Sequence, residues 1–151
     1  MGQSLTAVYC HITFSTKKRQ PLIRESISEP LHAYMASILK NMDSPAIIIN
    51  SMPDHIHILL RISKTRTIAD LVEEIKKSSS KWIKMQPDGD TSFFWQRGYS
   101  AFSISASHVN AISRYIANQK KHHQKMTYRQ EIEKLMRKYR VTEYDPSYFW
   151  D

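Results

Sequence analysis

The sequence predicts an α+β fold in which an antiparallel sheet carries helices on one face. The first observation is strict alternation in residues 55–63, HIHILLRIS, which is typical of a half-buried strand. The second is the recurrence of apolar residues at helical spacing over residues 26–40 and 68–85. The third is the order of the expected elements, β-α-β-β-α-β-α, which is the split β-α-β pattern.

The first half of the chain is expected to form three strands and one helix. A strand over residues 5–14 has four apolar residues on one face, namely Val8, Cys10, Ile12 and Phe14. Residues 26–40 form a helix, and residues 46–51 form a short β-branched strand that ends at the turn Met52-Pro53-Asp54. The strand over residues 55–63 turns its isoleucines to one side and its histidines to the other.

The second half is expected to be mainly helical. A helix over residues 68–85 is followed by an aromatic, β-prone segment, residues 93–105. Because Arg97-Gly98 interrupts that segment, it predicts a bent strand or two short strands. Two helices follow, over residues 108–126 and 128–139, and the aromatic tail YDPSYFWD is expected to pack against the body.

Length and composition bound the class of protein. The chain has 151 residues, of which 41% are hydrophobic, so we expect a single domain, residues 1–151, with a core of its own. Its longest apolar run, residues 46–49, is too short to span a membrane, and the N-terminus lacks the features of a secretory signal. One cysteine, Cys10, suits a reducing compartment. These features predict a cytoplasmic protein without a membrane partner.

The charge of the chain is positive and unevenly distributed. Lysine and arginine number 22 against 14 aspartate and glutamate residues, which gives a net charge of +8. Residues 108–140 alone hold nine basic and two acidic residues. Such a stretch is typical of a protein that binds a polyanion, but a solvated helix face explains it equally well.

His55 and His57 could form a metal site. Residues two apart on a strand point to the same side, about 6–7 Å apart, so both imidazoles can reach one ion. In a chain with seven histidines, however, such a pair also arises by chance. Tyr115 and Gln119 lie four apart and share a helix face. Taken singly, they are an ordinary tyrosine at the edge of an apolar stripe and a solvated glutamine.

Taken together, these residues resemble a known family. His55-Ile56-His57 matches the histidine–hydrophobic–histidine (HUH) motif, and Tyr115 followed by Gln119 matches the second motif of the single-tyrosine HUH transposases. These are enzymes of the insertion-sequence 200/605 type and their repeat-associated relatives. The similarity covers residues 5–125 in the family's order, through HITFSTKKRQPLI, WQRGYSAFSIS and YIANQKKHH.

This resemblance implies a ferredoxin-like, RNA-recognition-type sheet with an added tyrosine-bearing helix. It implies a DNA transposase that cleaves and rejoins single-stranded DNA at hairpin-forming element ends. Tyr115 would attack the DNA to form a 5′-phosphotyrosine intermediate, and His55, His57 and Gln119 would bind Mg²⁺ or Mn²⁺. The family implies a homodimer whose tyrosine helix can complete the partner's site. No nucleotide cofactor is expected, because the covalent intermediate retains the bond energy.

The residues around the motifs have simpler interpretations. His122 and His123 are expected to be surface histidines, and Asp54 is expected to shape the turn before His55. Four basic residues are expected to contact the DNA backbone, which adds affinity without sequence choice: Arg114, Lys120, Lys121 and Lys125.

Three other functions remain open. The first is a replication or plasmid-transfer nickase of the same chemistry, although such enzymes are usually larger. The second is a domesticated nuclease that acts on genomic repeats, for which the chemistry would be unchanged. The third is a non-catalytic module that binds single-stranded nucleic acid, but binding alone requires none of the four motif residues.

Overall fold

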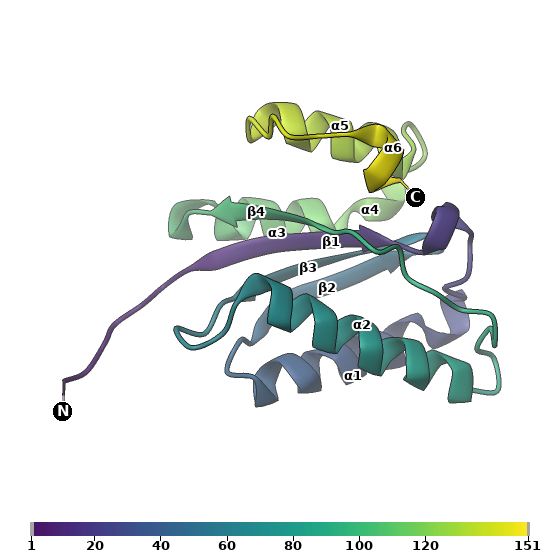
Figure 1. Cartoon of the computed structure of the whole chain (residues 1–151), viewed down its shortest axis with the longest axis horizontal. Helices are drawn as coiled ribbons and strands as arrows, with labels where there is room; N and C mark the ends of the chain where they lie inside the picture. The colour runs from purple at the N-terminus through teal and green to yellow at the C-terminus, as the bar shows by residue number, and fades with distance from the viewer. Residues whose placement is uncertain (1, 151) are drawn as a thin grey trace.

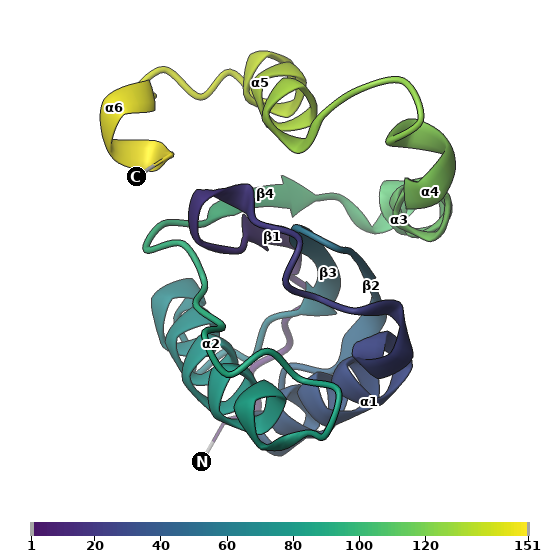
Figure 2. The ribbon, with the colours of Figure 1, turned by 90° about the vertical axis from the view of Figure 1, so that its right-hand side faces the viewer.

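The computed structural model describes residues 2–150, and within them four strands form one antiparallel sheet in the order β2-β3-β1-β4. Helices cover both faces of this sheet, as Figures 1 and 2 show. The strands are β1 (Tyr9–Ser15), β2 (Ala46–Met52), β3 (His55–Arg61) and β4 (Ser100–Ile104). The helices are α1 (Glu25–Asn41), α2 (Ile68–Met85), α3 (Val109–Ala117), α4 (Gln119–His122), α5 (Tyr128–Lys138) and α6 (Pro146–Phe149), with short 3-10 turns η1 (Lys17–Arg19) and η2 (Ala106–His108).

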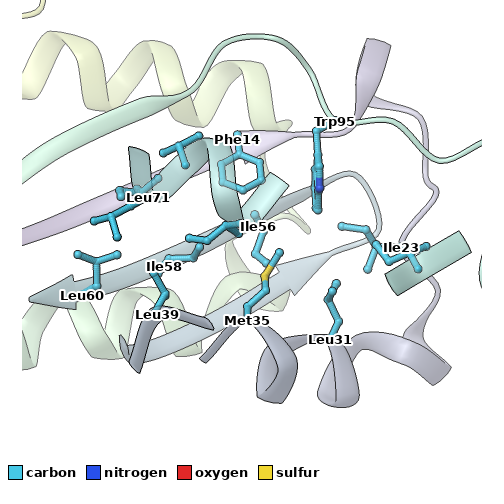
Figure 3. Close-up of a cluster of buried hydrophobic side chains, with 14 of the residues drawn as sticks. Phe14, Ile23, Leu31, Met35, Leu39, Ile56, Ile58, Leu60, Leu71 and Trp95 are labelled. Carbon is cyan, nitrogen blue, oxygen red and sulfur yellow. The ribbon is translucent and has the colours of Figure 1, made fainter. Parts of the chain in front are cut away.

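The main core lies between the sheet and helices α1 and α2 (Figure 3). Every second residue of β1 and β3 points into it, and Phe14 lies opposite Ile56 in the strand register. Helix α1 contributes one buried residue per turn, namely Ile27, Leu31, Met35 and Leu39. Burying an aliphatic side chain of this size stabilises the fold by about 1.5–3 kcal/mol. This layer therefore holds β3, and the two histidines on its opposite face, in a fixed position.

The opposite face of the sheet is also covered, by α3, α4, α5 and α6 (Figure 2). The expectation of helices on one face is therefore wrong. The physical reason is that this face carries apolar side chains too, among them Leu59 and Phe102. Ile116 of α3 packs on Leu59, and Ile132 of α5 packs in the cluster around Phe102. The aromatic tail packs against the cluster around Phe102 through Phe149 and Trp150, as the sequence predicts.

The predicted α+β class and the order of the elements are confirmed, but three strands are shorter than expected, among them β3, which ends at Arg61 rather than at residue 63. Strand β1 begins at Tyr9 rather than at residue 5, because its register partners on both sides, Arg61 and Ile104, end their own strands there. Of residues 93–105, only Ser100–Ile104 form a strand, while Trp95 makes a single bridge to Thr16. Among the described residues, no helix is both long enough and apolar enough to cross a membrane.

The expectation of a single helix over residues 108–126 is also wrong. Helix α3 ends at Ala117, Asn118 leaves the helical conformation, and α4 begins at Gln119. Asparagine is a weak helix former whose conformational freedom suits a helix end. The second helix begins at Gln119, whose side chain is fully buried.

Candidate active site

The two histidines of β3 lie beneath the C-terminal helices, on the face of the sheet opposite the main core. Both side chains are fully buried. In the register of the sheet, His55 lies opposite Ser15 and His57 opposite Thr13. The two imidazole rings lie 5.1 Å apart, centre to centre. The alternation of the strand therefore does place both imidazoles on one side.

A carboxylate from α5 lies between these histidines and a third one. Oε1 of Glu131 lies 3.1 Å from Nε2 of His57, 3.6 Å from Nε2 of His55 and 2.9 Å from Nε2 of His123. The candidate ligand atoms of these four residues all lie within 4.8 Å of one another. Three imidazole nitrogens and one carboxylate oxygen at such separations form a group that could hold a divalent metal ion.

Tyr115 and Gln119 join the same cluster. The Tyr115 hydroxyl donates a hydrogen bond to Oε2 of Glu131. The Gln119 side chain donates its Nε2 to that same oxygen at 3.0 Å, and its Oε1 lies 3.2 Å from Nε2 of His55. All four motif residues identified in the sequence thus meet in one network, within a single chain.

The position of each helix has a local cause. Asn50 of β2 donates its side-chain amide to the carbonyl of Ile116 at 2.8 Å, which ties the end of α3 to the sheet. Helix α5 begins with a capping box in which Thr127 and Gln130 satisfy each other's backbone N–H groups. The next residue is Glu131, so the cap fixes its place in the first turn of α5.

Two further residues orient the imidazoles. Nδ1 of His55 lies 2.6 Å from Oδ1 of Asp54. A carboxylate only accepts, so Nδ1 carries the proton, and Nε2 faces Oε1 of Glu131 and Oε1 of Gln119. Nδ1 of His57 lies 2.8 Å from Nε2 of His11 on β1. Ligating histidines usually hold their second ring nitrogen in such a hydrogen bond, which sets the tautomer and the ring orientation.

The buried charge of Glu131 controls the protonation of its neighbours. Burial alone raises the pKa of this carboxyl, but hydrogen bonds from His123 and His57 outweigh burial and hold its pKa well below the usual range. Burial raises the pKa of the Tyr115 phenol, and the adjacent Glu131 carboxylate raises it further. Without a cation in the site, Tyr115 therefore stays protonated at neutral pH.

Several of these residues lie in other surroundings than the sequence predicts. The expectation that His123 is a surface histidine is wrong, since its side chain is only 10% exposed and contacts Glu131. His122 is also partly buried, with its ring centre 4.6 Å from that of Tyr115. Asp54 contacts His55 in addition to ending the turn.

The sequence contains a signal for Glu131. In the helix over residues 128–138, the buried stripe comprises Tyr128, Glu131, Ile132, Leu135 and Met136. An acidic residue within an apolar stripe needs a partner in the interior, because burying an unpaired charge is costly. His11 gave no comparable signal, because one histidine on the polar face of a strand is ordinary.

The four basic residues that are expected to contact DNA are all exposed. Along the chain they lie within a few residues of Tyr115, Gln119 and His123. Lys120 pairs with Glu25 at 3.3 Å, and both side chains are largely solvent-exposed. A concavity of about 610 Å³ is lined by Lys120 and His123, and a second, of about 400 Å³, by Lys125 and His123. Two open depressions with a lysine at each rim therefore adjoin the buried cluster.

The comparison with protein families decides which family this is. The sequence profile of the family described as "Transposase IS200 like" matches residues 4–119. The chain belongs to this family. The matched segment contains His55, His57, Tyr115 and Gln119, whereas Glu131 and His123 lie beyond it.

Individual relatives of the IS200-like family are distant in sequence. The chain is 23% identical over 116 residues to the ISDra2 transposase TnpA of Deinococcus radiodurans, which spans 72% of this chain and 81% of that protein. A solved structure described as a transposase from the same organism has a TM-score of 0.59 at 23% identity, over 79% of this chain and 96% of that one. A REP-associated tyrosine transposase, solved bound to a REP hairpin, has a TM-score of 0.60 at 13% identity. The match covers 82% of this chain and 72% of that one.

The metal-free protein should lose stability as the pH falls. Burial lowers the pKa of His11 to about 3, from 6.5. The folded state therefore favours neutral His11, and its contribution is complete above pH 6.5 and declines towards pH 3 by roughly 3 to 5 kcal/mol. Glu131, with its lowered pKa, adds a loss of the same sign below about pH 4.5. Urea unfolding at a series of pH values, in the presence of a chelator, measures the slope of the free energy of unfolding against pH.

His11→Gln keeps a polar partner for His57 and removes the titrating group, so its stability should depend less on pH between 6.5 and 3. The exposed His108 is the matched control, and His108→Gln should leave the slope unchanged. Equal slopes for the His11 variant and the parent protein would contradict the conclusion that His11 causes the pH dependence of stability.

Proposed function

We propose that this IS200-like protein is a DNA transposase that cleaves and rejoins single-stranded DNA through Tyr115. The observation that carries the proposal is the single network that joins the Tyr115 hydroxyl to His55, His57 and Glu131. Family membership supports it, and so does a fold shared with a REP-associated tyrosine transposase that was solved bound to a REP hairpin. Its substrates would be hairpin-forming element ends in the cytoplasm.

In this reaction the Tyr115 oxygen attacks the phosphorus of a phosphodiester. A bond forms between the phenol oxygen and phosphorus, and the bond from phosphorus to the 3′ oxygen breaks. The 3′ oxygen leaves with the electron pair and takes a proton, which gives a 5′-phosphotyrosine and a free 3′-OH. Oε2 of Glu131 already accepts the phenol hydrogen bond, so it holds the hydroxyl in position, and the phenol proton passes to solvent water as the bond to phosphorus forms. Attack by a 3′-OH on the phosphotyrosine reverses the sequence and rejoins DNA without a nucleotide cofactor.

The residues present fit a divalent ion, with His55, His57, His123 and Glu131 as candidate ligands and Gln119 beside them. When bound, such an ion would offset the carboxylate charge next to Tyr115 and polarise the scissile phosphate. A donor set rich in imidazole suits Mn²⁺ better than Mg²⁺, which prefers oxygen ligands. We therefore propose a divalent-metal enzyme that binds Mn²⁺ more tightly than Mg²⁺.

The proposal is tested by trapping the intermediate. The protein is incubated with Mn²⁺ and labelled single-stranded DNA from the sequences that flank its own gene, and the mixture is separated on a denaturing gel. A covalent DNA–protein adduct that requires the ion supports the proposal. Binding without any adduct on all flanking strands would favour the non-catalytic module.

Replacing Glu131 with glutamine should weaken Mn²⁺ binding by at least about tenfold. The substitution preserves size but removes the only negative charge among the four candidate ligands. Calorimetric titration with Mn²⁺ measures the change. Glu133 on the same helix hydrogen-bonds Tyr144, away from the histidines, so Glu133→Gln is the matched control and should bind as the parent does. Equal affinities for both variants would remove Glu131 from the ligand set.

Reversing the charges of Lys120 and Lys121 should reduce the salt dependence of DNA binding. Each phosphate contact with a single strand contributes about 0.7 to the slope of log affinity against log salt concentration. The double variant Lys120→Glu/Lys121→Glu should therefore lower the slope by roughly 1.4. The control is Lys77→Glu/Lys81→Glu on α2, across the sheet from the site. An equal decrease in both proteins would indicate only a general effect of net charge.

We further propose that the protein works as a homodimer, as the family resemblance implies. Tyr115 and the histidine pair already meet within one chain, so a dimer is not needed to bring them together. A monomer with full cleavage activity, measured by light scattering at the working concentration, would dismiss the dimer.

A further inference from the structure

A loop at the end of the sheet adjoins the active site and has no role in the chemistry above. It contains η1 and appears in purple at the right of Figure 1. The segment that precedes β4 runs beside it: the N–H of Lys17 donates to the carbonyl of Phe94 at 2.8 Å, and that of Gln96 to the carbonyl of Ser15 at 2.9 Å. On its other side, the N–H of Thr16 donates to the carbonyl of Asp54 at 2.9 Å. The loop therefore contacts Asp54, the residue that precedes His55.

An aromatic ring is held out into solvent at this place. Phe94 is 56% exposed, although its neighbours Phe93 and Trp95 are buried in the main core. The two buried rings pack edge to face at 4.7 Å, and Figure 3 shows Trp95 at the edge of the core. The core therefore fixes the backbone on both sides of Phe94 and presents its ring in a defined position. A single exposed apolar residue is ordinary on a protein surface, so what surrounds the ring decides whether it can bind a ligand.

Cationic side chains surround this ring. Nζ of Lys84 lies 4.4 Å from the ring centre, and Nζ of Lys17 lies 6.0 Å from it. Lys17, Phe94, Trp95 and Arg97 line a concavity of about 340 Å³. Both Lys17 and Arg97 are exposed, so their charges are available to a ligand.

Both walls of the concavity are held in place. Lys18 and Arg19 have φ angles of 57° and 55°, which non-glycine residues seldom adopt, and the Thr16 hydroxyl closes the loop by donating to the carbonyl of Gln20 at 2.6 Å. Backbone strain of this kind is concentrated at functional sites. The opposite wall is held by Lys76, whose Nζ donates to the carbonyls of residues 96, 97 and 98 at 2.7, 3.1 and 2.7 Å.

We propose that this concavity binds one unpaired nucleotide of single-stranded DNA, with the base stacked on Phe94 and the phosphate between Lys17 and Arg97. The proposal rests on the proposed function. An exposed ring can stack on a free base, whereas the bases of a duplex are already stacked on each other. The cations match the charge of a phosphodiester. Because the loop adjoins Asp54 and His55, the nucleotide would belong to the unpaired strand next to the cleavage site.

The test uses the full-length protein in a chelator, so that binding is measured without cleavage. The probe is a fluorescent oligothymidylate, and affinity is measured by anisotropy. Phe94→Ala should weaken binding about tenfold or more, whereas Phe94→Trp, which retains a stacking surface, should stay within about twofold of the parent. Tyr148, an aromatic residue on α6 that is 82% exposed, is the matched control, and Tyr148→Ala should bind normally.

A second variant decides the case if Phe94→Ala folds poorly. Lys17→Gln/Arg97→Gln should lower the slope of log affinity against log salt concentration by roughly 1.4, for two lost phosphate contacts. Unchanged affinity in Phe94→Ala, or an unchanged slope in the double variant, would overturn the proposal. So would an equal loss of duplex binding, or a change of molecular mass that indicates a contact with a second copy. Adduct formation by the parent protein is measured separately, so the proposed function can survive these outcomes.

Discussion

Replacing Tyr115 with phenylalanine should abolish the covalent DNA–protein adduct and reduce cleavage by at least about four orders of magnitude. The substitution removes the one oxygen that would attack phosphorus, and losing a nucleophile usually eliminates nearly all catalysis. It leaves the ring in place, so packing against His122 and the sheet is retained. The lost hydrogen bond to the buried Glu131 carboxylate should lower the free energy of unfolding by about 1–3 kcal/mol, and Gln119 remains as a partner of the same oxygen. Adduct formation and single-turnover cleavage measure the effect.

The control for this variant is Tyr139→Phe. Tyr139 also packs beside the sheet, stacked on Phe102 at 4.8 Å, but it lies outside the hydrogen-bonded network of Glu131. Its variant should cleave DNA at the parental rate. DNA binding by Tyr115→Phe should remain within about threefold of the parent, since one hydroxyl adds little to binding that phosphate contacts dominate. A Tyr115→Phe protein that still forms an adduct would assign the nucleophile elsewhere.

Replacing His55 and His57 together with glutamine should weaken Mn²⁺ binding by at least about a hundredfold. Cleavage should be lost at ion concentrations that saturate the parent protein. Altering residues that merely support a metal ligand already costs 10- to 100-fold in affinity, so removing two candidate ligands should cost at least as much. Calorimetry measures the affinity without reference to activity. Undiminished cleavage by the parent in excess chelator would exclude a metal role altogether.

Glutamine is preferred to alanine because of what surrounds these histidines. Glu131 is buried, and its hydrogen-bond partners include His57. Truncation to alanine would leave this carboxylate with fewer partners, and a buried polar group without its partner costs about 1–3 kcal/mol or more. His108→Gln, at an exposed histidine that contacts Ser105, is the control for the loss of an imidazole. It should leave both metal binding and cleavage unchanged.

Several features of the site follow from local sequence patterns. The period of two in residues 55–61 places His55 and His57 on one side of β3 and the aliphatic residues on the other, because successive side chains of a strand alternate. The spacing of Tyr115 and Gln119 predicts that they lie together, although the break at Asn118 changes how this is achieved. In both cases the spacing is short, so the local backbone geometry decides the outcome.

The sequence by itself therefore determined the fold class, the order of the elements, the family and the face of the sheet on which His55 and His57 lie. Only the tertiary structure decided which residues meet these histidines. They are Glu131 of α5, His123 after α4, and His11 of the neighbouring strand β1. The physical reason is separation along the chain, which is 74 residues between His57 and Glu131 and 46 between His11 and His57. Periodicity fixes the direction of a side chain within its own element. Which residues meet across elements depends instead on how apolar faces such as Leu59 with Ile116 pack, and that is a property of the whole chain.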